Sequence, residues 1–259
     1  MKVRDITSVI EEFAPLGIQE SWDNGGLCIG SPDDEVHGVL VGFDCTPELI
    51  AEAVRRGLDM VVTHHPLIFG GLKRIVPGDP VSDAVSAAIR GHVAVYASHT
   101  SADKVIGGVS GAMARRLGLE DIRILDEEEG GVGLGAVGEL PRPMEAEEAL
   151  EYVKKCFSLK VIRSSRPVSG LITRVAMCGG SGGSLIGKAR ASGAKLYISG
   201  DISYHNFFTP EGFMVADIGH FEGEVEIVDI LFSLLTKKFP NFATCISEDV
   251  RNSNPIHYF

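Results

Sequence analysis

Metal chemistry is indicated by four of the eight histidines, which stand where predicted β-strands end: His64, His65, His99 and His220. Asp103 follows His99 by four residues, and Glu224 follows His220 by the same interval. Residues at i and i+4 of a helix or turn lie on one face, so each histidine can share a face with its carboxylate. Imidazole and carboxylate donors without cysteine suit divalent Zn, Mn, Fe, Ni or Mg.

The adjacent pair His64 and His65 favours two metal ions rather than one. Neighbours in an extended strand point to opposite sides, but at a strand end the chain can bend and send one ring to each ion. A carboxylate can then bridge the ions, roughly 3.5–4 Å apart, as in two-metal hydrolytic sites. Each residue taken alone also has a structural interpretation, because strand-end histidines are often hydrogen-bonded within the fold and Pro66 fits a simple turn.

A strand–helix–strand unit positions His64 and His65. Residues 39–43 and 60–63 are apolar and predict buried strands. The helix between them has Thr46 as its cap, Pro47 at its first position and Gly57 at its end. The histidine pair follows the second strand directly, at the edge where α/β proteins bind ligands.

The same pattern recurs 136 positions later without a gap, with strands at 175–178 and 196–199. In this register Gly57 falls on Gly193, and His64–His65 fall on Gly200–Asp201. Any two such units look broadly alike, but the ungapped match favours an internal duplication. We therefore predict an α/β fold with two related α/β halves packed around a central metal-binding cleft.

We place the two halves at residues 1–125 and 126–259, with a turn or hinge in the acidic run from Asp126. The C-terminal segment could pack back on the first half, and the halves could form a single intertwined domain. Further helices are expected near residues 5–15, 82–90, 106–117, 145–156 and 222–236. The glycine-rich run 130–138 predicts a strand that passes close to another backbone.

Composition excludes several classes of protein. A net charge of −11 without a basic run makes nucleic-acid binding unlikely. Five scattered cysteines without C-x-x-C spacing argue against a disulfide framework and a thiolate zinc site. We find neither a secretory signal nor an apolar run long enough to span a bilayer, so we expect no membrane association and a cytoplasmic location.

Residues 62–69 (VTHHPLIF) resemble the Nif-three-like dinuclear metal-binding family, whose members are also known as GTP cyclohydrolase 1 type 2 homologues. The resemblance covers essentially the whole chain in the right order, without the middle domain that some members insert. Further similar runs are 22–27 (WDNGGL), 96–103 (YASHTSAD), 178–182 (CGGSG), 200–205 (GDISYH), 219–224 (GHFEGE) and 254–259 (NPIHYF).

The resemblance implies two divalent metal ions per chain, with Glu224 as the bridge and five ligands: His64, His65, Asp103, His220 and Glu224. His99 and His205 are candidate general acids, and His99 could instead orient Asp103. Asp201 and Tyr204 could line the same cavity, whereas Asn24 and Asp44 are weaker candidates for which a structural turn serves equally well. The family usually has other residues at 101–102 and 221–223, which puts substrate contacts there in doubt.

Two functions remain open at this stage. The resemblance implies a metal-dependent hydrolase acting on GTP or another nucleotide or phosphoester, and an assembly into homohexamers. The alternative is a non-catalytic metal-binding scaffold or metallochaperone that docks protein partners.

Overall fold

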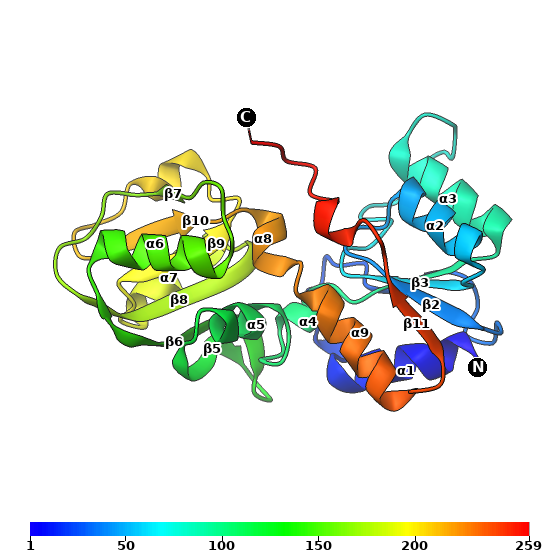
Figure 1. Cartoon of the computed structure of the whole chain (residues 1–259), viewed down its shortest axis with the longest axis horizontal. Coiled ribbons are helices and arrows are strands. Elements are labelled where there is room, and N and C mark those ends of the chain that lie inside the picture. The colour runs from blue at the N-terminus through cyan, green and yellow to red at the C-terminus, as the bar shows by residue number, and fades with distance from the viewer. Residues whose placement is uncertain (259) are drawn as a thin grey trace. The chain divides into compact units, whose positions relative to one another are not determined.

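The computed structural model describes residues 1–258 and divides into two compact α/β units (Figure 1). The first unit comprises Met1–Ala102 and Ile227–Pro255, and the second comprises Asp103–Glu226 with the residues from Ile256. The boundary therefore lies at Ala102/Asp103 rather than at 125/126, and residues 227–255 return to the first unit. Phe259, the last residue of the C-terminal run, lies outside the described residues.

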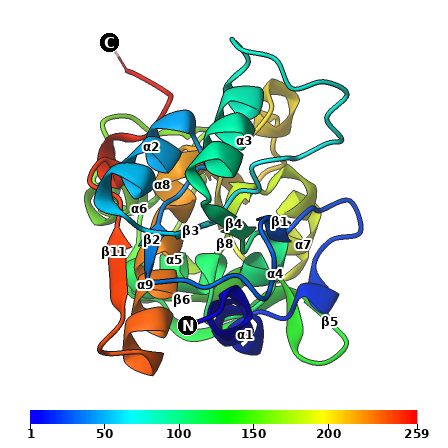
Figure 2. The ribbon, with the colours of Figure 1, turned by 90° about the vertical axis from the view of Figure 1, so that its right-hand side faces the viewer.

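A five-stranded sheet forms the centre of the first unit, in the order β1-β4-β3-β2-β11. All neighbouring strands are parallel except β1 with β4. The strands are β1 (Gly26–Ile29), β2 (Gly38–Val41), β3 (Met60–Thr63), β4 (Ala94–Ala97) and β11 (Ala243–Ile246). Four principal helices accompany them: α1 (Val3–Phe13), α2 (Pro47–Arg56), α3 (Pro80–Gly91) and α9 (Ile227–Lys238). Helices α2 and α3 cover one face of the sheet, and α1 and α9 cover the other (Figures 1 and 2).

Helix α2 has the ends that the sequence predicts. The Thr46 hydroxyl accepts a hydrogen bond from the Leu49 amide at 3.2 Å, and Pro47 occupies the first turn. Gly57 ends the helix in the left-handed region, at φ 66°, where a side chain would be strained. The helix buries Leu49, Ile50 and Ala53 against the sheet, so its amphipathic pattern fixes which face packs inward.

A six-stranded sheet forms the centre of the second unit, in the order β5-β6-β8-β9-β10-β7. Strands β8, β9 and β10 are parallel, and the remaining neighbours pair antiparallel. The strands are β5 (Glu120–Glu128), β6 (Val132–Met144), β7 (Arg163–Ser164), β8 (Ile172–Ser181), β9 (Leu196–Gly200) and β10 (Met214–Asp217). The helices are α5 (Val109–Arg116), α6 (Ala146–Cys156), α7 (Ile186–Ala191) and α8 (His220–Glu224), with 3-10 turns η2 (Gly183–Leu185) and η3 (Tyr204–Phe207).

The duplication is visible in the strand register. Val39 pairs with Met60 in the first unit, and Val175 pairs with Leu196 in the second, which is the same pairing shifted by 136 positions. The order β2-β3-β4 in one sheet therefore corresponds to β8-β9-β10 in the other. The predicted α/β class is confirmed, and the predicted repeat has a physical counterpart in two three-stranded parallel cores.

The acidic run from Asp126 leads into the turn of a β-hairpin, which confirms the predicted turn and not the alternative of a hinge between the halves. Glu128 pairs with Val132, and Gly130 and Gly131 make the turn with φ values of 87° and 73°. The glycine-rich strand that follows passes close to other backbones, as predicted, because a Cβ at Gly133 would lie 2.1 Å from the Asp126 carbonyl oxygen.

Among the described residues, no helix is both long and apolar enough to cross a membrane.

Candidate metal centre

Two consecutive histidines leave the end of β3 in fixed orientations. The amides of His64 and His65 both donate to the Phe43 carbonyl, at 3.1 and 3.3 Å, and the Thr63 hydroxyl donates to the His65 carbonyl at 2.8 Å. The fully buried His64 ring uses Nδ1 to donate to the Ser98 carbonyl at 2.9 Å. A carbonyl only accepts, so this contact places the proton on Nδ1 and makes Nε2 the nitrogen suited to a metal.

His65 and His99 are oriented in the same way by carboxylates. The Nδ1 atom of His65 lies 2.7 Å from Asp44 Oδ1, and that of His99 lies 2.8 Å from Asp23 Oδ1. Such carboxylate–histidine pairs fix the tautomer and raise the basicity of the other ring nitrogen. Asp44 thus supports the histidine pair directly.

The three histidines of the first unit converge. One ring nitrogen from each of His64, His65 and His99 lies within 4.8 Å of the others, and the ring centroids are 4.9–5.4 Å apart. Three imidazoles that share a small volume, each with Nδ1 bound to oxygen, form a donor set that fits a divalent transition metal. His99 therefore lies among the candidate ligands themselves, whereas the sequence indicated it as a general acid or as a residue that orients Asp103.

Asp23 orients His99, a role that the sequence alone does not indicate. Its second carboxylate oxygen accepts from the Thr100 amide at 3.0 Å and from the Thr100 hydroxyl at 2.5 Å. Burial alone raises the pKa of Asp23, but the hydrogen bonds from His99 and Thr100 outweigh it and lower that pKa to about 2. The motif 22–27 marked this segment, yet no spacing rule connects Asp23 to a histidine 76 positions later.

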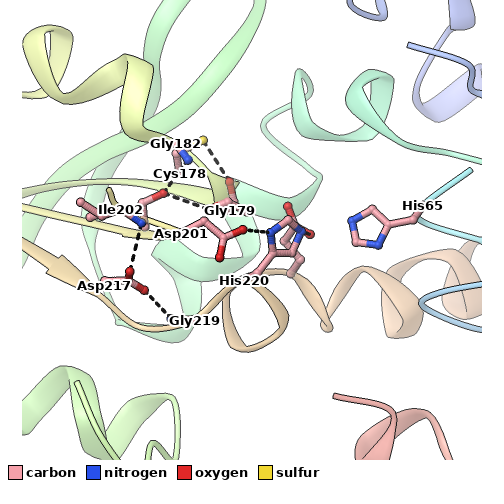
Figure 3. Close-up of polar contacts among 12 residues, drawn as sticks. His65, Cys178, Gly179, Gly182, Asp201, Ile202, Asp217, Gly219 and His220 are labelled. Carbon is pink, nitrogen blue, oxygen red and sulfur yellow. Dashed lines mark hydrogen bonds and ion pairs between the residues drawn. The ribbon is translucent and has the colours of Figure 1, made fainter. Parts of the chain in front are cut away.

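In the second unit, helix α8 carries two candidate ligands one turn apart. His220 Nε2 lies 2.9 Å from the buried Glu224 Oε2, which confirms that the i,i+4 spacing puts both groups on one face. His220 Nδ1 lies 2.8 Å from Asp201 Oδ2 (Figure 3). Asp201, predicted to line the cavity, thus orients His220 as Asp44 orients His65.

Asp217 stabilises the loops that carry Asp201 and His220. Its carboxylate accepts from the Ile202 amide and from the Gly219 amide, both at 3.0 Å (Figure 3). These amides are the neighbours of Asp201 and His220 in the chain, so one buried carboxylate joins the two loops that carry them. The backbone of Asp201 is in the left-handed region, at φ 50°, a conformation that aspartate tolerates better than most residues.

Glycines make room for the carboxylate of Glu224. A Cβ on Gly180 would lie 2.1 Å from Glu224 Oε1, and a Cβ on Gly200 would lie 2.7 Å from the His220 amide. In the 136-residue register these glycines correspond to Asp44 and His64 of the first unit. The two halves have therefore diverged. The first has side-chain donors at these strand ends, whereas the second has glycines there, and its donors come from α8.

Asp103 and Glu224 both act on the thiol of Cys178. Burial, and then the charges of Asp103 and Glu224, raise the pKa of this cysteine to about 12. The thiol is thus kept protonated beside the carboxylates, and the candidate donor set of the second unit consists of oxygen and imidazole nitrogen.

The remaining sequence candidates make contacts of other kinds. Tyr204 and His205 belong to the exposed turn η3, where both rings contact Phe208. Asn24 donates from Nδ2 to the Ile68 carbonyl at 2.7 Å, a contact that links two segments 44 positions apart and is not internal to a turn.

Comparisons with known proteins agree with this architecture. A family model described as Duf34/NIF3 (NGG1p interacting factor 3) matches residues 1–253. A GTP cyclohydrolase 1 type 2 homolog from Lactococcus lactis is 34% identical over 264 aligned positions, which cover 99% of each chain. A relative of the same name from Clostridium perfringens is 32% identical over 228 residues, covering 86% of this chain and 87% of the relative. The crystal structure of the Staphylococcus aureus hypothetical protein SA1388 matches with a TM-score of 0.92 at 26% identity, over 100% of this chain and 99% of that one.

Proposed function

The chain belongs to the Duf34/NIF3 family, and on this basis we propose that it binds two divalent metal ions. The proposed ligands are His64, His65, Asp103, His220 and Glu224, with Glu224 as the bridging carboxylate. The observation that carries this proposal is the shared orientation of the histidines, because His64, His65 and His220 each have Nδ1 bound to an oxygen.

The five proposed ligands are distributed over the two units of the chain. The first unit offers imidazoles, and the carboxylates Asp103 and Glu224 belong to the second. Asp103 is the first residue after one crossing point, four positions from His99, and Glu224 lies just before the other crossing point at Glu226/Ile227. We infer that the proposed nitrogen and oxygen ligands include residues on either side of these crossings in the sequence.

The activity we propose is metal-dependent hydrolysis of GTP or of another nucleotide or phosphoester. Bound divalent ions would lower the pKa of water and polarise the group under attack. The Asp23 carboxylate holds the proton of His99 on Nδ1, which leaves Nε2 to receive a proton and later return it to a leaving group. The name shared by the relatives from Lactococcus lactis and Clostridium perfringens, GTP cyclohydrolase 1 type 2 homolog, supports testing GTP first.

Turnover of GTP, other nucleotides and simple phosphoesters by metal-loaded protein tests this activity. We expect His99→Gln to lower kcat by about 100-fold or more, the usual contribution of a general acid or base. His37→Gln is the matched control, since His37 also pairs with an aspartate (Asp59, 3.0 Å) but is largely exposed. Metal-loaded protein that leaves every substrate unchanged would contradict the hydrolase proposal and favour a scaffold or metallochaperone.

A further inference from the structure

We propose that Trp22 and Phe69 form a stacking subsite for a planar heteroaromatic group, such as a nucleobase, on the substrate of the metal centre. The inference rests on the proposed function, because it assigns a substrate class to the same site. Both side chains remain more than half exposed, at 58% and 57%, although they are among the most hydrophobic in the chain. Apolar side chains that cluster on an exposed surface are a feature of ligand-binding sites.

The two rings form a nearly parallel pair beside a histidine of the site. Their centroids lie 6.0 Å apart with an interplanar angle of 25°. Trp22 and Phe69 each meet the His99 ring edge-on, at centroid distances of 6.0 and 5.5 Å. A ring that stacked on this pair would therefore stand within reach of the His64, His65 and His99 cluster.

Hydrogen bonds from neighbouring residues hold both rings in place. Asn24 Nδ2 donates to the Ile68 carbonyl at 2.7 Å, which ties the segment of Trp22 to the segment of Phe69. Asp23, next to Trp22, is bound to both His99 and Thr100. The aromatic pair is therefore built on the same support that orients His99, and its position relative to that ring is fixed before a ligand arrives.

The chemistry of the pair selects the ligand class. Aromatic faces stack on any planar base with little dependence on its hydrogen-bonding edge, and each such contact contributes substantially to binding. The exposed surface of two aromatic rings beside one imidazole has the size of a small planar ligand. A specific protein interface needs a much larger patch. The group we assign is therefore the base of a nucleoside or nucleotide.

Trp22 is the only tryptophan in the chain, so its fluorescence reports directly on this subsite. We expect guanosine and GMP to quench the emission of the metal-loaded protein saturably, whereas ribose 5-phosphate leaves it unchanged. Phe69→Ala is expected to weaken GMP binding by about 5-fold or more, given the usual strength of a base–aromatic contact. Calorimetry with Trp22→Ala is expected to show a similar loss without relying on fluorescence.

Phe208→Ala is the control, because Phe208 is another exposed phenylalanine, in the second unit, and this variant should bind GMP like the parent. Metal content is measured on the same samples. If the parent protein retains metal but GMP does not quench its fluorescence, or quenches Phe69→Ala equally, the subsite alone is overturned. If the parent protein does not retain metal, the proposed function is overturned. A change in oligomeric state on Phe69→Ala would assign the pair to an interface between copies and also overturn the inference.

Discussion

Gly180 leaves space for the carboxylate of Glu224, because it has no side chain. The residue has φ 58°, and a Cβ would approach Glu224 Oε1 to 2.1 Å. We expect Gly180→Ala to destabilise the fold by about 1–3 kcal/mol and to lower metal content, because both the backbone and the carboxylate must move. Thermal unfolding and elemental analysis measure the two effects.

Gly187→Ala is the control for that substitution. Gly187 lies in α7, where an added Cβ meets no atom within 4 Å, so alanine there should leave metal content unchanged and stabilise the fold by about 0.4–1 kcal/mol. Equal metal content in the Gly180 and Gly187 variants would show that Glu224 is not a ligand held by this glycine.

Asp44 would act on the proposed metal site through its hydrogen bond with His65, so its removal separates the orientation of that ring from metal ligation. We expect Asp44→Asn to weaken metal binding by about 10–100-fold, as for other carboxylates that hold a metal-bound histidine. Asp59→Asn changes the same kind of pair at exposed His37 and should leave the affinity unchanged. Equal affinities in competition titrations with a chelator would contradict this role.

The sequence could indicate the histidines, and Asp44 and Asp201 as candidates near them, but not the role of Asp23 in orienting His99. His64, His65 and His220 stand at strand ends, and that local signal is sufficient to find them. Asp23 reaches His99 only after the sheet has formed, since 76 positions separate them and no periodic pattern links the two. Contacts of this kind depend on tertiary packing, which leaves no trace in spacing.

At the scale of elements, Glu52 joins helix α2 to the segment that returns after β11. It accepts from the Ser247 hydroxyl at 2.7 Å, from Arg56 Nη1 at 2.6 Å and from the Glu248 amide at 3.2 Å. Burial alone raises the pKa of Glu52, but these hydrogen bonds outweigh it, so the pKa is lowered from its usual value of 4.5. The ionised carboxylate therefore stabilises the folded state.

The acid dependence of unfolding tests this contact. A group with a lowered folded-state pKa stabilises the fold above its unfolded pKa, and that stabilisation is lost as the pH falls below about 4.5. We expect Glu52→Gln to cost about 1–3 kcal/mol at neutral pH and to reduce the loss of stability on acidification. Urea unfolding across pH 3–7 that gives parallel curves for both proteins would show that Glu52 contributes no such dependence.

The helices and strands themselves were largely predictable. Helix α2 has its predicted cap and end, and the 136-residue register reappears as matching strand pairs. The third strands correspond at a different shift, however, because Ala94 and Met214 occupy equivalent pairing positions, 120 residues apart. At this shift His220 corresponds to Thr100 and not to His99. The two His-x-x-x-carboxylate runs, 99–103 and 220–224, are therefore offset by one residue in the aligned halves.

At the scale of the whole molecule, the first unit is discontinuous in sequence. Strand β11 pairs with β2 from Ala243↔Gly38 to Ile246↔Val41, and α9 buries Ile227, Val228, Leu231 and Leu235. The second half predicted from the sequence includes residues 227–259, because pairing between strands 205 positions apart has no local signature. Only the possibility that the C-terminal segment packs back on the first half anticipated this arrangement.

A truncation tests how far the first unit depends on its returning segment. We expect a chain ending at Glu226 to lose amide-exchange protection in β2, β3 and β4, because the sheet edge and one covering helix are gone. A chain ending at Pro255 keeps both elements and should retain that protection. Full protection of β2–β4 in the shorter chain would show that the segment is dispensable for the first unit.

The central proposal is that the chain binds two divalent ions, and the metal-to-protein ratio tests it most directly. Elemental analysis of manganese-loaded protein should give two ions per chain, with an electron paramagnetic resonance spectrum of a coupled pair. His64→Ala in the first unit and Glu224→Gln in the second should each lower the ratio and abolish the coupling, whereas His37→Gln and exposed Glu211→Gln should not. A ratio unaffected by either ligand variant, or a spectrum of isolated ions, would contradict the account.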